Sequence, residues 1–214
     1  MVGILFVVYL IFYFYTDTAT LSDYTDASTL VTIPATSLAD PKSTNYAYSL
    51  WIYVNDWSVK YGFPKTLFKR DGGTPRVDLG LVDNTLTTTV MLQDGTLTQC
   101  TIQNIPIQKW TNIIVTVDEK ALDTYLNGKL VKTCMLRAPQ HTIADDTALQ
   151  LTPDGGFSGY TARFKYWGTS ISPQEAWNVY KNGPGGNFLS SFFNQFKLQL
   201  NFIKGNETKA SITI

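Results

Sequence analysis

The sequence predicts an all-β protein, a two-sheet antiparallel sandwich, and three observations support this prediction. The chain has 214 residues, of which 44% are hydrophobic and 14% aromatic, which is enough for one packed domain. Charged residues make up only 16%, and much of the remaining polarity comes from Tyr and Thr, which pack well on a pleated surface. Apolar and polar residues also alternate along several short runs that turn residues separate.

The clearest strand pattern lies at residues 46–55. Tyr46, Tyr48, Leu50, Ile52 and Val54 alternate there with a second set that is also fairly apolar, which is typical of a central strand. Further strands are expected at residues 65–69, 76–82, 85–93 and 96–102. Between the last two, Asp94-Gly95 predicts a type I′ hairpin turn, because both central positions of that turn need positive φ.

The stretch 105–136 predicts a three-strand antiparallel meander. Ile113, Val115 and Val117 alternate, a second alternating run follows at 122–126, and Asn127-Gly128 turns the chain into a third strand at 129–135. Two more strands are expected at 148–152 and 160–167. A short helix then begins after Ser172, because Ser172-Pro173-Gln174-Glu175 has the pattern of a capping box with proline in the first turn.

Residues 2–15 form an apolar run without a charged side chain. We expect an uncleaved membrane anchor, in which Ile4, Leu5, Phe6, Val7, Leu10 and Phe12 contact lipid. The run is short for this role, about 22 Å as a helix against a hydrocarbon core near 30 Å. A cleaved signal peptide and burial against a partner protein are the alternatives. Residues 17–45 are expected to be a linker with one edge strand at 30–33, stopped by Pro34.

Several motifs together resemble the laminin-G/concanavalin A-like lectin and glucanase superfamily. The resemblance spans about residues 46–183 and implies a jelly-roll sandwich. Its markers are a strand–Tyr-x-Asn-Gly–strand hairpin and a late Ser-Pro-x-Glu helix, carried here by Trp110, Tyr125, Asn127-Gly128-Lys129, Gly155-Gly156-Phe157, Gly159-Tyr160 and Ser172-Pro173-Gln174-Glu175.

A closer resemblance is to the form of this domain found in large DNA viruses of algae and protists. It rests on the runs PIQKW, LDTYLNGKLVKTC, GGFSGY and SPQEAWNVYKNGPGG. The resemblance implies an anchor at 1–16, the linker at 17–45, the jelly-roll at 46–183 and a tail at 184–214 that packs on the sandwich or on a partner.

The two cysteines, Cys100 and Cys134, each lie in a predicted strand beside the meander. If these strands lie side by side, the thiols come within reach of a disulfide. Two buried free thiols are the alternative. Two cysteines and the single histidine, His141, cannot supply a four-ligand zinc site on their own.

No residue pattern indicates catalysis, and we expect a protein that is not an enzyme. The chain lacks a Gly-x-Ser-x-Gly elbow, and its one histidine lies in a predicted loop. The Glu-x-Asp-x-Glu run of the related glucanases, which places its carboxylates on one strand face, is also missing. Asp118, Glu119 and Asp123 instead surround a tight turn, where acids are normally solvated.

Binding is the remaining class of function. No cofactor is expected; Ca²⁺ is the open alternative, with oxygens from Asp145-Asp146, Asp154 or the pair Asp78 and Asp83. Trp57, Tyr61 and Tyr160 are candidates for stacking on sugar faces. Asn206, in Asn-Glu-Thr, is a candidate glycosylation site.

Two functional hypotheses follow. The first is a structural role in a virion, as a membrane-anchored minor capsid protein that contacts membrane lipid and other capsid proteins. The second is a carbohydrate-binding or adhesion module tethered to a cell-surface membrane. Nucleic acid is not an expected partner, because Lys and Arg together equal Asp and Glu at 17 each, so the net charge is zero.

Overall fold

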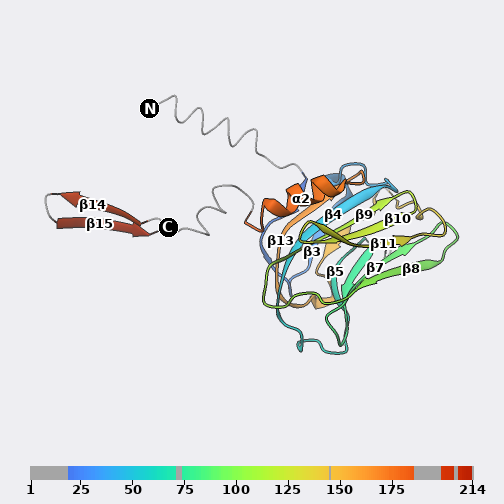
Figure 1. The fold of residues 1–214 in the computed structure, drawn as a ribbon, viewed down its shortest axis with the longest axis horizontal. Helices are drawn as coiled ribbons and strands as arrows, with labels where there is room; N and C mark the ends of the chain where they lie inside the picture. Colours follow the sequence, from blue (N-terminus) through green and yellow to red (C-terminus); the bar gives the residue numbers. More distant parts are fainter. Residues whose placement is uncertain (1–18, 71–73, 145, 186–198, 205–206, 214) are drawn as a thin grey trace, which may run out of the picture.

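Two antiparallel β-sheets packed face to face form the sandwich (Figure 1), seen in a computed structural model. The structure describes residues 19–70, 74–144 and 146–185, and the backbone of 199–204 and 207–213. The predicted membrane-anchor residues and Asn206 lie outside the described residues. Within the described part, no helix is both long and apolar enough to span a bilayer.

Sheet A has the strand order β1-β13-β4-β9-β10-β11, with β2 also paired to β13. Every pairing in it is antiparallel. Its strands are β1 (Thr20–Ser22), β2 (Thr25–Asp26), β4 (Tyr46–Asp56), β9 (Thr111–Asp118), β10 (Ala121–Leu126), β11 (Lys129–Met135) and β13 (Ser158–Trp167).

Sheet B has the order β3-β12-β5-β6-β7-β8 and is also antiparallel throughout. Its strands are β3 (Val31–Ile33), β5 (Lys65–Arg70), β6 (Arg76–Leu79), β7 (Leu86–Met91), β8 (Leu97–Ile102) and β12 (Leu149–Leu151). Two short 3₁₀ helices, η1 (Ala35–Ser37) and η2 (Pro153–Gly155), lie in the connections. Farther along the chain, β14 (Gln199–Lys204) and β15 (Glu207–Thr213) form a separate hairpin.

The core lies between the two sheets, where the apolar residues of each strand meet. From β4, alternate residues beginning at Tyr46 and ending at Val54 face this core, as their period of two predicts. Among the aromatic residues, Phe157 and Phe164 are buried in this core, Trp51 is buried on the opposite face of sheet A, and Trp177 is exposed.

Helix α2 (Pro173–Lys181) packs on the outer face of sheet A. The predicted capping box is confirmed: the Glu175 amide donates to Ser172 Oγ, and the Ser172 amide donates to the Glu175 carboxylate at 2.7 Å. Ala176 and Ile171 pack against Ala47, Ile114 and Tyr125 of the sheet. The helix therefore covers part of a sheet face that would otherwise expose apolar side chains to water.

Three details differ from the sequence predictions. The strand expected at 76–82 ends at Leu79, because Gly80 begins a turn so tight that a Cβ there would lie 2.4 Å from Asp83 O. The prediction of a type I′ turn at Asp94-Gly95 is wrong, because only Gly95 of this pair has positive φ. At the other hairpin turn, Asn127 and Gly128 both have positive φ, as a type I′ turn requires. Strands β1 and β2 were not predicted, because a Thr- and Asp-rich segment shows no alternation when only two or three residues pair.

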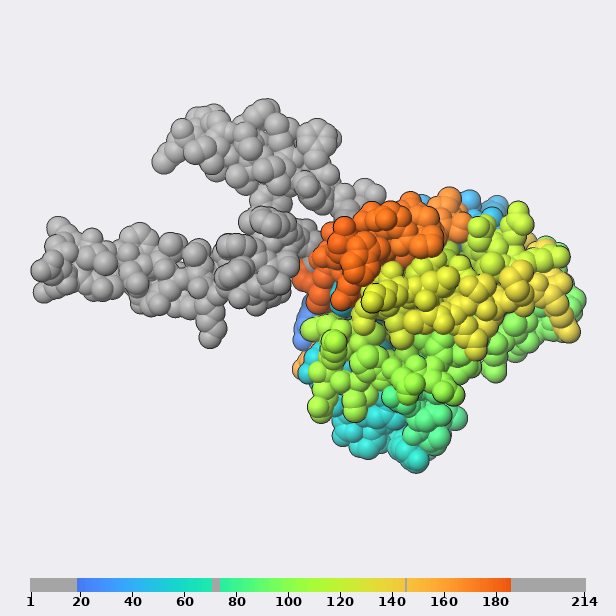
Figure 2. Space-filling model, in the orientation of Figure 1, coloured from blue at the N-terminus to red at the C-terminus, as the bar shows by residue number. Residues whose placement is uncertain are grey.

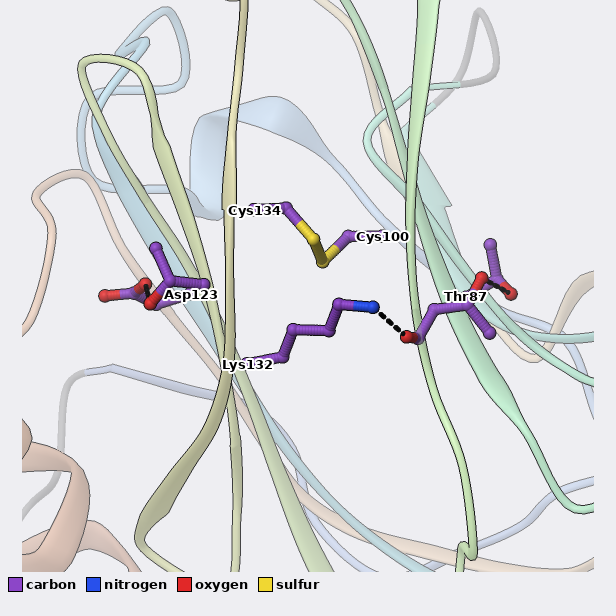
Figure 3. Close-up of a disulfide and its surroundings, with 7 residues drawn as sticks. Thr87, Cys100, Asp123, Lys132 and Cys134 are labelled. Atoms are coloured by element: carbon purple, nitrogen blue, oxygen red, sulfur yellow. Dashed lines mark hydrogen bonds between the residues drawn. A yellow bond between two sulfur atoms is a disulfide. The ribbon is translucent and has the colours of Figure 1, made fainter.

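A disulfide joins Cys100 of β8 to Cys134 of β11, with their Cα atoms 6.0 Å apart (Figure 3). These are the outermost strands of sheet B and sheet A in the described topology, so the bond connects the two sheets rather than neighbours within one sheet. Lys132 Nζ also crosses between the strands and donates to Thr101 O at 2.8 Å. One side of the sandwich is thus closed by a covalent bond.

Candidate functional site

The outer face of sheet A is only partly covered by α2. Beneath the helix, Trp51 of β4 stacks on Tyr180 with ring centroids 5.6 Å apart. Two residues farther along β4, Tyr53 lies on the same face and is half-buried. Tyr53 pairs with Tyr160 of β13, so both rings lie on this part of the sheet.

Four aromatic side chains form what we call the aromatic ledge: Tyr24, Tyr53, Trp110 and Tyr160. Tyr24 stacks on Tyr160 at 5.3 Å with 24° between the planes. Trp110 meets Tyr24 edge-on at 6.2 Å and Tyr53 edge-on at 5.6 Å. Tyr24 is 64% exposed, whereas the other three rings are half-buried. The ring contacts fix the orientation of the ledge while Tyr24 remains open to solvent.

A polar cavity lies next to the ledge. Asn55 and Ser158 are two residues from Tyr53 and Tyr160 along their strands, and Asp26 is the strand partner of Tyr160. The cavity has a volume of about 280 Å³ and is lined by Asp26, Ser28, Asn55, Val59, Lys60, Gly155, Phe157, Ser158 and Gly159. The site therefore combines aromatic faces with carboxylate, amide and hydroxyl groups.

Two hydrogen bonds favour the ionised form of the Asp26 carboxylate. Ser28 Oγ donates to Asp26 Oδ1 at 2.6 Å and the Ser28 amide donates to the same oxygen at 2.8 Å. These bonds, the side-chain one first, lower the pKa of Asp26 below its ordinary value. Both bonds end on Oδ1, which leaves Oδ2 able to accept a hydrogen bond from a ligand.

Two glycines bring the strands of this site together. A Cβ on Gly159 would lie 1.9 Å from Tyr53 O, and a Cβ on Gly156 would lie 1.9 Å from Ala27 O. Only glycine permits the beginning of β13 to approach β4 and the end of β2 so closely. The Gly-Gly-Phe-Ser-Gly-Tyr motif is therefore what places Ser158 and Tyr160 at the site.

The sequence-derived sugar contacts occupy different places in the structure. Tyr160 lies in the aromatic ledge. Trp57 is half-buried and packs against the core, with Lys65 Nζ 5.7 Å from its ring centre. Tyr61 is 60% exposed on the loop after β4. The sequence did not identify Tyr24, Tyr53 and Trp110 as contacts. The ledge forms only when β4, β13, the turn between β1 and β2 and the start of β9 come together from distant parts of the chain.

The other candidate residues have local partners. Asp78 accepts two hydrogen bonds from Arg76 Nε, at 2.8 and 2.7 Å, Asp83 accepts one from Thr85, and Asp154 pairs with Lys69 at 3.3 Å. His141 is exposed. Among the residues that the structure describes, no three His, Cys, Asp or Glu side chains gather as a metal site would require.

A second groove lies on the outer face of sheet B. Its polar lining includes Arg76, Asp78, Thr85, Thr87 and Gln99. None of the described residues that line this groove is aromatic, and the guanidinium of Arg76 is held by Asp78. It lacks the stacking surface that distinguishes the ledge.

The family of the chain follows from its match over most of the domain. A model of the concanavalin A-like lectin/glucanases superfamily matches residues 25–176. The chain belongs to this superfamily. The match includes strands β3 to β13, and it begins at β2, within the segment expected to be a linker.

Solved structures with the same fold include binding domains of botulinum neurotoxins. The serotype D ligand binding domain in complex with N-acetylneuraminic acid has a TM-score of 0.61 and 11% identity, and the match covers 79% of this chain and 45% of that one. The receptor binding domain of botulinum neurotoxin D has a TM-score of 0.59 and 11% identity, covering 78% and 46%. The serotype G binding domain has a TM-score of 0.52 and 14% identity, covering 65% and 37%.

The chain thus matches less than half the length of each of these structures. At these identities the similarity shows the fold alone. No curated protein matches the chain.

Proposed function

We propose that the domain is a non-enzymatic carbohydrate-binding module and that the aromatic ledge, with the polar cavity beside it, is its sugar site. The observation that carries this proposal is the ledge itself: an oriented aromatic surface, exposed at Tyr24 and half-buried at its other rings, on a sheet face that α2 leaves uncovered. The C–H faces of a pyranose pack on aromatic rings, as apolar ligand surfaces do in binding sites generally.

The cavity supplies the polar half of such a site. Asp26, Asn55 and Ser158 offer acceptors and donors for sugar hydroxyls within one concave surface. That one structural neighbour binds N-acetylneuraminic acid supports a sugar as the ligand class. A non-catalytic role is consistent with the missing Glu-x-Asp-x-Glu run, which the superfamily's glucanases use for hydrolysis.

A glycan array tests this proposal. The full chain should bind a restricted set of glycans, and Tyr24→Ala should weaken that binding about tenfold or more, because one stacking ring is lost. Tyr61→Ala is the matched control, since Tyr61 is 60% exposed against 64% for Tyr24 but lies outside the ledge. No glycan binding, or an equal loss in both variants, would contradict the proposal.

A second candidate function is the scaffold role, a membrane-anchored minor capsid protein of a large DNA virus. The observation that favours it is the exposure of four apolar residues on the two linked outer strands: Leu97 of β8, and Leu130, Val131 and Met135 of β11. Outer strands with exposed apolar side chains are common docking sites for other chains. Cross-linking of this edge to a shell protein in purified particles would support this role, and particles that lack the chain would exclude it.

A further inference from the structure

Helix α2 presents a second aromatic surface beside the aromatic ledge. Trp177 is 37% exposed, and its ring centroid lies 5.4 Å from that of the half-buried Tyr180. Tyr180 in turn stacks on Trp51, which is buried beneath it. Trp51 and the ledge residue Tyr53 lie two positions apart on the same face of β4. The rings of α2 therefore continue the ledge along the outer face of sheet A.

The turn between β10 and β11 fixes the position of this aromatic pair. A Cβ on Gly128 would lie 2.9 Å from Tyr180 Cβ and 3.0 Å from Trp177 Cε3, so a side chain here would push α2 away from the turn. Figure 2 shows the contact from outside, where the orange atoms of α2 lie against the yellow atoms of β11. Trp177 therefore has a defined place next to the turn.

A polar group lies between the two aromatic surfaces. Asn127 is half-buried, and its Oδ1 accepts a hydrogen bond from the Asn112 amide at 3.0 Å, which leaves its Nδ2 group able to donate to a ligand. Asn112 lies two residues after Trp110 of the ledge and is the strand partner of Trp51. We call Asn127, Trp177 and Tyr180 the helix extension of the ledge.

The ledge and the helix extension follow one another across the end of sheet A. Tyr160 lies on β13 and Tyr53 on β4, whereas Trp110 precedes β9. Asn127 follows β10, and these four strands are neighbours in this order. Neighbouring strands lie about 4.8 Å apart, so Tyr160 and Asn127 are about 14 Å apart across the sheet. Aromatic rings spaced along a surface bind successive units of a chain, as they do in proteins that bind single-stranded nucleic acid.

We propose that the sugar site takes an extended oligosaccharide of several units, which runs from the aromatic ledge across Asn127 to Trp177. This inference rests on the proposed carbohydrate-binding function. One unit stacks at Tyr24 and Tyr160 and reaches the polar cavity, and a later unit packs on Trp177. A hydroxyl of a unit between them accepts a hydrogen bond from Asn127 Nδ2.

The dependence of affinity on chain length tests the proposal. The strongest glycan found on the array is trimmed one unit at a time to the monosaccharide, and calorimetry with the full chain gives the affinity of each fragment. For the wild type, affinity should rise by about tenfold or more between one unit and the length that reaches Trp177. Full affinity at one unit would overturn the proposal and leave the carbohydrate-binding function intact. No glycan binding at all would contradict that function, and this inference with it.

Variants of α2 locate the gain in affinity. Trp177→Ala should bind the shortest fragment as the wild type does, which also shows that it is folded, and should lose the gain from longer fragments. Trp177→Phe should keep part of the gain, because an aromatic ring remains. Gln174→Ala is the control: Gln174 is exposed and donates to Asn178 of the same helix at 3.2 Å, so this variant should match the wild type at every length. The proposal is overturned if Trp177→Ala keeps the gain, or if it weakens all fragments equally.

Discussion

At the scale of single residues, Lys165 of β13 lies on the face of sheet A turned away from the core, paired with Ser49, yet only 4% of the residue is exposed. Burial lowers its pKa to about 8 from 10.5. Between these values the unfolded chain binds more protons than the folded one, so the free energy of unfolding rises with pH. The destabilisation caused by burying the charged ammonium is therefore fully present below pH 8 and disappears as pH rises toward 10.5.

The prediction is that Lys165→Met gains most in stability over the wild type at pH 7 and progressively less toward pH 10. A shift of this size corresponds to a difference of about 2–3 kcal/mol between the two ends of the range. Urea unfolding of both proteins across the range measures it. Parallel pH profiles would show that Lys165 keeps an ordinary pKa.

Gly156 fixes the close approach of the η2–β13 segment to the chain at Ala27. We expect Gly156→Ala to cost several kcal/mol, because its Cβ would lie 1.9 Å from the Ala27 carbonyl oxygen, and to weaken sugar binding by displacing Ser158. Gly95→Ala is the control: it also has positive φ, but nothing lies within 4 Å of its Cβ, so it should cost only about 1–2 kcal/mol. Equal losses in thermal melts of the two variants would contradict this account.

At the scale of elements, the disulfide connects strands that share no hydrogen-bonded ladder. It closes a loop of 34 residues, for which the loss of chain entropy in the unfolded state corresponds to about 3–4 kcal/mol. Cys100→Ala with Cys134→Ala should therefore lower the free energy of unfolding by this amount and shift the urea midpoint to lower concentration. A reductant should affect only the wild type. A wild-type midpoint that does not respond to reduction would be inconsistent with a stabilising bond.

Helix α2 depends on its capping box for a defined start. Ser172→Ala removes the hydroxyl that accepts the Glu175 amide and should cost about 1 kcal/mol. Gln174→Ala changes an exposed position in the same turn and should be nearly neutral. Thermal melts compare the two, and a loss in Gln174→Ala as large as that in Ser172→Ala would mean that the cap is not responsible.

At the scale of the whole molecule, features set by neighbouring residues were predictable from the sequence. The alternation at residues 46–55, the Asn127-Gly128 turn and the capping box each depend on a few consecutive residues, and all three occur in the structure. The aromatic ledge was only partly predictable, because Tyr53 and Tyr160 meet through the pairing of two strands far apart in the chain. No local pattern shows that Tyr24 stacks on Tyr160 or that Trp57 turns toward the core.

The location of the ligand on the molecule is the central claim, and nuclear magnetic resonance of the full chain titrated with a glycan from the array measures it most directly. The account expects the signals of Tyr24, Tyr53 and Tyr160 and the indole N–H of Trp110 to shift with the same affinity, together with the amides of Asn55 and Ser158. Shifts confined to Arg76, Thr87 and Gln99, in the groove of sheet B, would contradict it.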